Sequence, residues 1–199
     1  MNNSKKYTLF YILVFTCFFI ACSDLTRSDK PAATTWWLKP YNGLIGSSVA
    51  VPVLPLELTL TAVPGLDSDK ILTLSPDAEL KPYAGARWTD HVPELLGSLI
   101  ERSLQASGRF EILHGPADTG SRTCELQLEL LEFFAELNTG GRTTGVRAAL
   151  SGRYQCGSAA AVDVHSSVSI SVADERMNII VAAFQQATDR MTREILDQI

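Results

Sequence analysis

Two stretches in the middle of the chain alternate apolar and polar residues over a length typical of a long β-hairpin. Within residues 124–130 the apolar side chains stand at even positions, and from Leu131 to Leu137 they stand mostly at odd positions. A strand changes the face of its apolar side chains only by inserting a residue, so we predict a β-bulge near residues 130–132. The alternative is a strand that is buried on both faces at this point.

Residues 146–156 alternate in the same way and supply the second strand of the hairpin. The intervening residues 138–145 (NTGGRTTG) are rich in glycine and could be compared with an anion-binding loop. Such loops join a strand to a helix, however, and here both neighbours read as strands. The segment therefore predicts the tip of the hairpin.

Shorter strands and two amphipathic helices are predicted around this hairpin. Further strands are indicated at residues 35–40, 56–63, 71–74, 79–83, 110–114 and 162–172. Helical spacing of apolar residues predicts one helix from about Pro93 to Ser107, stopped by Gly108, and a closing helix with Asp174 as its N-cap. The expected fold is α+β: a single domain with a largely antiparallel or mixed sheet and a long hairpin, covered by the two helices.

The N-terminus combines a short positive region with an apolar run that ends at a cysteine. Lys5 and Lys6 precede residues 9–20, which are almost entirely apolar, and this order is typical of a secretory signal. The run is short for a membrane span, since a spanning helix needs about 20 apolar residues. Residues 19–22 (FIAC) resemble a bacterial lipobox, in which a lipid is attached to the cysteine and the chain is cleaved just before it. Phe19 departs from the leucine that is usual in that pattern.

The lipobox resemblance implies that Cys22 carries a lipid anchor, with fatty-acid chains such as palmitate. Residues 1–21 are then a lipoprotein signal peptide, residues 22–34 the lipidated cysteine and a flexible tether, and residues 35–199 the periplasmic α+β domain. The alternative is a retained N-terminal anchor helix in which Cys22 is incidental. Because Ser23 replaces the aspartate that retains lipoproteins in the inner membrane of enteric bacteria, that sorting rule implies the periplasmic face of the outer membrane.

Charge limits the classes of partner. The formal charge of the whole chain is −5, and removal of residues 1–21 takes away two lysines and no acidic residue. This balance argues against nucleic acid and against general attraction to anionic lipid headgroups. No second run of 18 apolar residues follows Cys22, so the remainder is expected to be soluble.

Cys124 and Cys156 lie near the two far ends of the predicted hairpin, both on its apolar face. The midpoint between them is residue 140, in the hairpin tip, so the two cysteines should be nearly opposite one another. In an oxidising periplasm we expect a disulfide, which the chain-entropy model values at roughly 3–4 kcal/mol for such a loop. The alternative is two buried free thiols. No metal site is predicted, because these cysteines and the three scattered histidines show no ligand spacing.

The common catalytic motifs are missing from the sequence: it has no GxSxG, no HExxH, no P-loop and no CxxC. His91 stands beside Asp90 and Glu94 in the stretch WTDHVPE, where an acid–base role could be imagined. The same stretch begins the first predicted helix, so capping and solvation account for these residue types. We therefore predict that the protein is not an enzyme and needs no cofactor.

Residues 84–113 resemble the signature of a known family. The segment contains A-R-W-T-D at residues 86–90, P-E-L-L at 93–96 and S-G-R-F at 107–110, which is similar to the ABC-type transport auxiliary lipoproteins of the PqiC/YmbA type. The stretch WWLKP stands where that family often has a tyrosine-rich strand. The resemblance implies a non-catalytic periplasmic component of a lipid-trafficking system. Its implied partners are MCE-domain proteins, which carry lipid between the two membranes and are sometimes coupled to an ABC transporter.

Two roles are open for Arg87, Trp88 and Asp90. In a structural role, Asp90 caps the first turn of the helix and Trp88 fills the space between the sheet and the helix. In a functional role, Arg87 and Trp88 stay partly exposed and bind a partner, since tryptophan and arginine dominate interface hot spots.

Other functional classes and the oligomeric state are also open. One class is a lipoprotein partner of an outer-membrane β-barrel assembly or a lipopolysaccharide transport complex, and another is an anchored hydrolase. Self-association into a homo-oligomer is compatible with the sequence, which does not specify it.

Overall fold

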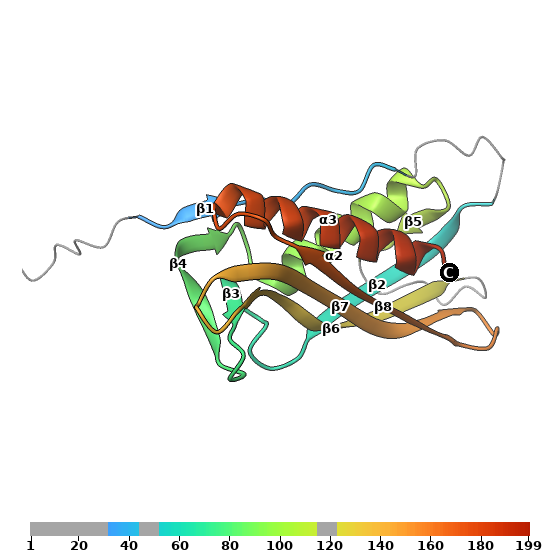
Figure 1. Cartoon of the computed structure of the whole chain (residues 1–199). Helices are drawn as coiled ribbons and strands as arrows, with labels where there is room; N and C mark the ends of the chain where they lie inside the picture. Colours follow the sequence, from blue (N-terminus) through green and yellow to red (C-terminus); the bar gives the residue numbers. More distant parts are fainter. Residues whose placement is uncertain (1–31, 44–51, 115–122) are drawn as a thin grey trace, which may run out of the picture. The chain divides into compact units, whose positions relative to one another are not determined.

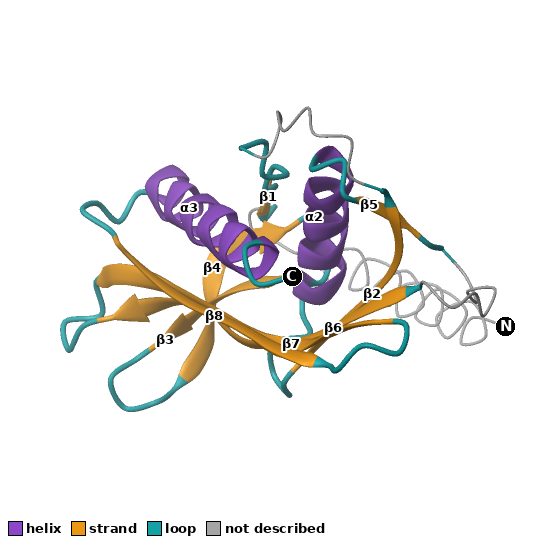
Figure 2. Cartoon of the chain, turned by 90° about the vertical axis from the view of Figure 1, so that its right-hand side faces the viewer, coloured by secondary structure: helices purple, strands orange, loops and turns teal. Residues whose placement is uncertain are grey.

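A mixed β-sheet forms one layer of the molecule and two helices form the other (Figures 1 and 2). The computed structural model describes residues 32–43, 52–114 and 123–199. All of these except Ala32 belong to one compact unit, Ala33–Ile199. The predicted α+β class, with a mixed sheet and two covering helices, is confirmed.

Eight strands and two helices make up the described part of the chain. In chain order they are β1 (Thr34–Trp36), β2 (Leu54–Ala62), β3 (Lys70–Leu74), β4 (Leu80–Trp88), α2 (Val92–Ala106), β5 (Phe110–Ile112), β6 (Cys124–Leu137), β7 (Thr143–Cys156), β8 (Val162–Ser171) and α3 (Met177–Leu196). Antiparallel pairs join β3 to β4, β6 to β7 and β7 to β8, and the pairs that join β1 to β4, β2 to β5, β2 to β6 and β3 to β6 are parallel.

The β6–β7 hairpin is the long pair predicted from the alternation. Its register shifts between Leu130 and Glu132, so the predicted bulge is confirmed, and a second shift falls between Glu136 and Leu137. Asn138 organises the tip, because its side-chain oxygen accepts hydrogen bonds from the amides of Gly140 and Arg142, at 2.9 and 3.0 Å. The glycine-rich segment is thus a hairpin tip.

The open end of the hairpin is closed by a disulfide. Cys124 and Cys156 face each other in the register, with their Cα atoms 3.9 Å apart, and a disulfide bond joins them across a separation of 32 residues. The predicted pairing is therefore present in the structure. The Tyr154 hydroxyl lies 2.9 Å from the Cys156 sulfur, and burial raises the pKa of this phenol.

Both helices lie on the same face of the sheet (Figure 2). Helix α2 packs against β2 and β5, and α3 packs against β7 and β8. Each turns a continuous apolar stripe toward the sheet, as the helical spacing predicted. The stripe of α2 includes Leu95, Leu96, Leu99, Ile100 and Leu104, and that of α3 includes Ile180, Phe184, Ala187, Met191 and Ile195. Among the described residues, no helix lies over the opposite face of the sheet.

The strand predicted at residues 35–40 is shorter than expected. Strand β1 ends at Trp36, and the chain then runs on beside the helices (Figure 1). Leu38 is fully buried there. The side chain of Gln185 in α3 fixes the segment, because it accepts a hydrogen bond from the Lys39 amide at 2.7 Å and donates one to the Lys39 carbonyl at 2.9 Å. A glutamine side chain thus takes the place of a neighbouring strand.

The predicted N-cap of the closing helix is wrong. Helix α3 begins at Met177, its N-cap residue is Arg176, and no side chain caps it. Asp174 instead accepts a hydrogen bond from the Arg176 amide at 2.8 Å and pairs with the Arg176 guanidinium at 2.9 Å. An aspartate that bonds the amide two residues on forms its own turn, and this local bond competes with capping.

Gly152 marks a close approach of the two hairpin strands and gives a first prediction. A Cβ atom at this position would lie directly against the Gln127 carbonyl oxygen and 2.9 Å from Leu128 Cδ2, in a part of the sheet that cannot move freely. We expect Gly152→Ala to lower the free energy of unfolding by about 1–3 kcal/mol, measured by urea or thermal unfolding.

Gly97→Ala is the matched control for this prediction. Gly97 lies inside α2, where a Cβ atom would meet Leu60 Cβ at an ordinary 3.9 Å. Alanine there should leave the stability unchanged or raise it by up to ~1 kcal/mol, because glycine is a poor helix former. Equal effects of the two substitutions would contradict the close approach at Gly152.

Candidate functional site

Trp88, the central residue of the sequence-predicted trio, is a core residue. It ends β4 with 1% of its surface exposed. Its ring centroid lies 5.7 Å from that of Phe133 in β6 and 5.1 Å from that of Phe184 in α3. The indole therefore fills the space between sheet and helix, as in the structural role. The partly exposed Trp88 that the functional role required is not found.

Arg87 and Asp90 are exposed on either side of Trp88. Arg87 reaches across to β1, where its Nε lies 3.4 Å from the Thr35 hydroxyl, and a guanidinium nitrogen lies 3.8 Å from an Asp69 carboxylate oxygen. Asp90 accepts a hydrogen bond from the next amide, that of His91, at 2.8 Å.

Asp90 does not cap helix α2, so this part of the structural interpretation is wrong. The N-cap residue is His91, and no side chain caps the helix. The free amides of the first turn are fewer than usual, because the Val92 amide donates to the Ser68 carbonyl at 3.1 Å and Pro93 has no amide hydrogen. The side chain of Asp90 therefore remains available at the surface.

The exposed aromatic residue of this region is Trp37, which directly follows β1. Trp37 is 63% exposed, the largest exposed fraction among the large apolar side chains of the described residues. The β1–β4 register pairs Thr35 with Arg87, and the Thr89 amide donates to the Trp36 carbonyl at 3.1 Å, so Trp37 leaves the sheet beside residues 87–90. We call Trp37, Arg87 and Asp90 the Trp37 corner. The sequence contained Trp37 in its WWLKP stretch but gave no sign of which tryptophan would be buried.

His91 takes part in a small surface cluster with Asp67 and Glu94. Its Nδ1 lies 2.8 Å from an Asp67 oxygen, and this hydrogen bond raises the pKa of the imidazole above its ordinary value. The three side chains could offer ligand atoms within 4.8 Å of one another to a cation. All three are exposed, and the Asp67–His91 bond already explains their arrangement. The raised pKa favours the imidazolium, which is a poor general base.

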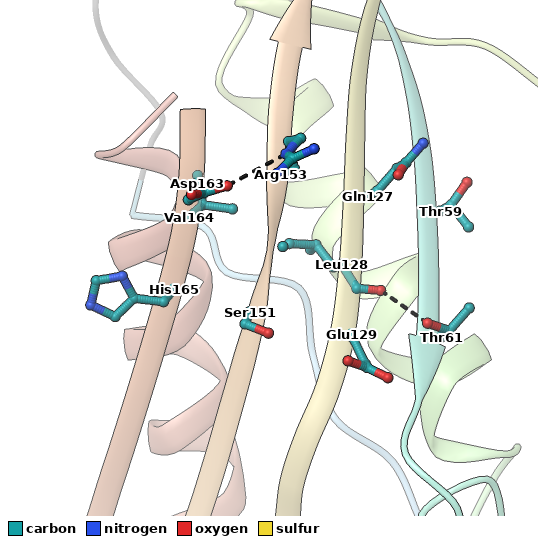
Figure 3. A pocket seen from close by; sticks show the side chains of 11 residues that line it. Thr59, Thr61, Gln127, Leu128, Glu129, Ser151, Arg153, Asp163, Val164 and His165 are labelled. Atoms are coloured by element: carbon teal, nitrogen blue, oxygen red, sulfur yellow. Dashed lines mark hydrogen bonds and ion pairs between the residues drawn. The ribbon is translucent and has the colours of Figure 1, made fainter. Parts of the chain in front are cut away.

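A shallow groove of about 620 Å³ lies on the face of the sheet that no helix covers (Figure 3). It crosses β2, β6, β7 and β8, and polar residues of these strands line it together with Leu128, Gly152 and Val164. Arg153 and Asp163 form an ion pair at 3.4 Å at one end of it. The main lining residues are Thr59, Thr61, Gln127, Glu129, Ser151, Arg153, Asp163 and His165.

The chemistry of this groove is that of hydrogen bonding and charge. A second, smaller groove of about 370 Å³ adjoins it near the bulge, where Arg147 pairs with Glu132 at 2.9 Å and with Glu136 at 3.6 Å. Both grooves are shallow and open to solvent and mix charged, polar and apolar groups, so they can contact a partner but do not enclose an acyl chain. Neither groove was predicted, although the polar positions of the alternating strands indicated this face. Neither includes His91.

The predicted lipid-attachment residue, Cys22, lies outside the described residues. Within the ranges that the structure does describe, neither helix combines the length and the apolar character that a membrane span requires. An anchor at Cys22 therefore stays a prediction from the sequence.

The Asp67–His91 bond gives a second prediction. Asp67→Asn should lower the pKa of His91 toward its ordinary value, because the hydrogen bond to Asp67 is the largest cause of the raised pKa. A group with a raised pKa stabilises the fold below its unfolded pKa of about 6.5, and this contribution is lost as the pH rises through the folded pKa. Titration of the His91 imidazole by NMR measures the change.

Glu94→Gln is the matched control for that titration. Glu94 acts on His91 through space only, so its substitution should lower the pKa of His91 by less. An unchanged pKa in the Asp67→Asn variant, or an equal change in the two variants, would show that the hydrogen bond is not what holds the imidazole charged.

Comparisons with known proteins agree on family and fold. A family model described as "ABC-type transport auxiliary lipoprotein component" matches residues 48–196. The crystal structure of a Xanthomonas campestris protein assigned to the DUF330 family has 19% sequence identity and a TM-score of 0.62, over 83% of this chain and 91% of that one. The crystal structure of an uncharacterized protein has 11% identity and a TM-score of 0.62, over 84% and 98% of the two chains. The search of curated proteins gives no match.

Proposed function

The chain belongs to the ABC-type transport auxiliary lipoprotein component family, and from this membership we propose a lipid-anchored protein on the periplasmic face of the outer membrane. Its role is that of a non-catalytic partner in an MCE-type lipid transport system that maintains the cell envelope. The observation that carries the proposal is the extent of the family match. Residues 48–196 contain every described helix and strand except β1.

The surfaces of the domain favour partner binding over lipid carriage or turnover. A protein that carries lipid alone needs an enclosed apolar cavity for acyl chains, whereas the larger groove found here is shallow and open to solvent. A hydrolase needs a nucleophile or base held in a water-excluding site, whereas His91 is exposed and already bonded to Asp67. Binding to a transport partner is therefore the activity we assign.

The Trp37 corner is the surface we assign to that partner. It combines an exposed tryptophan with an exposed arginine and an exposed aspartate. Tryptophan and arginine contribute more than other residues to interface hot spots. The corner keeps Arg87 and Asp90 from the original trio and replaces the buried Trp88 by Trp37. The partner is an MCE-domain protein in this proposal.

The third prediction compares the two tryptophans. Trp37→Ala removes an exposed ring, so the domain should keep its melting temperature and lose capture of the MCE-domain partner. Trp88→Ala removes a buried ring that contacts Phe133 and Phe184, so it should lower the free energy of unfolding by ~3–5 kcal/mol. Thermal unfolding and a pull-down of the tagged full chain, with mass spectrometry, measure both effects.

The pull-down also separates the proposal from its alternatives. Recovery of an outer-membrane β-barrel in place of an MCE-domain protein would favour the assembly or lipopolysaccharide-transport role. Partner capture by the Trp37→Ala protein at the unmodified level would remove the Trp37 corner as the binding surface. Hydrolysis of ester or glycan substrates by the purified protein, lost in His91→Ala, would overturn the non-catalytic role.

The fourth prediction concerns the anchor. Cys22→Ser removes the cysteine of the FIAC lipobox, to which the lipid is expected to be attached, so the protein should leave the outer-membrane fraction. Attachment of several acyl chains gives stable membrane binding, whereas unmodified protein has none of that apolar area. Fractionation of the membranes after a high-salt wash measures the change. If the Cys22→Ser protein stays with the outer membrane, the lipid anchor is excluded.

A further inference from the structure

Strand β8 leaves one of its two long sides without a neighbouring strand. It is ten residues long and pairs only with β7 within the described part of the chain. The β7–β8 register runs from Gly145–Ser171 to Tyr154–Val162 without a shift. In an uninterrupted antiparallel pair, alternate residues point both backbone groups to the same side. Every second residue of β8 therefore directs its amide and carbonyl away from β7.

The side chain of Gln198 shows which residues these are. It accepts a hydrogen bond from the His165 amide at 3.0 Å and donates one to the His165 carbonyl at 2.8 Å. Both backbone groups of His165 thus point away from β7, and so must those of the other odd-numbered residues. The chain end after α3 blocks the free side of β8 at His165 as a neighbouring strand would.

Beyond His165 the free side of β8 is open. Ser167, Ser169 and Ser171 point their backbone groups to this side, and all three residues are exposed. None of these groups has a hydrogen-bond partner among the described residues. The segment Ser167 to Ser171 contains no charged residue and no proline. We call it the serine edge.

Three other free sides of this sheet are protected against pairing. Strands β1 and β5 are only three residues long. The first half of β4 has one side without a neighbour, and it contains Lys81 and Pro82. Short edge strands, lysine and proline are the means by which proteins prevent pairing between sheets. The serine edge has none of them, although it is long enough for a ladder.

We propose that the serine edge binds the serine edge of a second copy of this chain, in an antiparallel ladder around a two-fold axis at Ser169. In this arrangement Ser169 faces Ser169 of the other copy, and Ser167 faces Ser171. The facing side chains on the uncovered face are all small and neutral, so nothing repels. On the helix side Val168 faces Ile170, which is partly exposed in the single chain and gains apolar contact.

The length of the open segment fits this register. A copy aligned on Ser169 pairs through residues 167–171, and its strand ends there as β8 does. The two hydrogen bonds between the Gln198 side chain and the His165 backbone lie just outside the paired residues, so they need not break. The symmetry also satisfies the general rule that two-fold interfaces use one self-complementary patch on both subunits.

A charge exchange at Ser169 tests the proposal and is the fifth prediction. Two differently tagged copies of the full chain are produced together, one tag is captured, and the other is quantified. Ser169→Lys in both copies places two like charges opposite each other and should lower co-capture by roughly fivefold. Combining a Ser169→Lys copy with a Ser169→Asp copy should restore it. Ser169→Pro in both copies should abolish co-capture, because each edge then lacks the central amide donor.

Two controls test whether a loss of co-capture comes from added charge elsewhere or from a damaged fold. Ser158→Lys adds the same charge in the exposed turn between β7 and β8 and should leave co-capture unchanged. Ser169→Pro should retain the melting temperature of the domain to within a few degrees, because the amide that it removes points away from β7.

Three outcomes would overturn the proposal. The first is a failure of unmodified copies to capture one another, and the second is equal co-capture by the doubly substituted Ser169→Lys protein. The third is a capture with Ser169→Lys protein in which the two copies are still recovered together but some other protein is lost. That result would show that the serine edge binds a different chain. None of these results depends on whether an MCE-domain protein is the transport partner.

Discussion

The pairing of β6 with β7 is the interaction on which the rest of the sheet depends. Each strand has 14 residues, and their outer sides pair with β2, β3 and β8. Strand β6 accepts β2 along its first half, up to Leu130, and β3 further on, from Ala135. The bulge between Leu130 and Glu132 lies between these two neighbours. A bulge bends its strand and increases the local twist, so one strand can serve two partners that point in different directions. The disulfide at the far end holds the same pair together.

Features that depend on a single pair of neighbouring segments could be predicted from the sequence. The change of alternation at Leu131 was sufficient for the bulge, and the symmetric spacing of Cys124 and Cys156 around the tip was sufficient for their pairing. Contacts between distant segments could not be predicted in this way. Parallel pairing of β2 with β6 depends on how the chain between them folds back. The Lys39 segment lies beside α3 because Gln185 offers it two hydrogen bonds, and nothing in residues 37–41 indicates that.

The candidate site illustrates the same limit with two tryptophans. Trp37 and Trp88 both stand in short stretches of mixed polarity, and one is exposed while the other is buried. The difference arises from register: β1 pairs Trp36 with Trp88 and then ends, so the next residue leaves the sheet. Helix α3 covers Trp88 through Phe184, whereas the Trp37 ring stays exposed. Sequence patterns of a three-residue edge strand contain too few positions to fix its register, whereas the long hairpin contains many.

The division of the sheet into a covered and an uncovered face determines what this domain can do. The helices bury the apolar face completely enough that the aromatic cluster of Trp88, Phe133 and Phe184 has no access to ligand. The uncovered face offers shallow, open grooves, which suit contacts with another macromolecule better than the enclosure of a small molecule. In the proposed role, partners bind at the edges of the sheet, where the backbone groups of the serine edge and the ring of Trp37 are accessible. A domain that binds at the edges of its sheet can hold a partner at each side while its core stays unchanged, and this suits the proposed role of an auxiliary component.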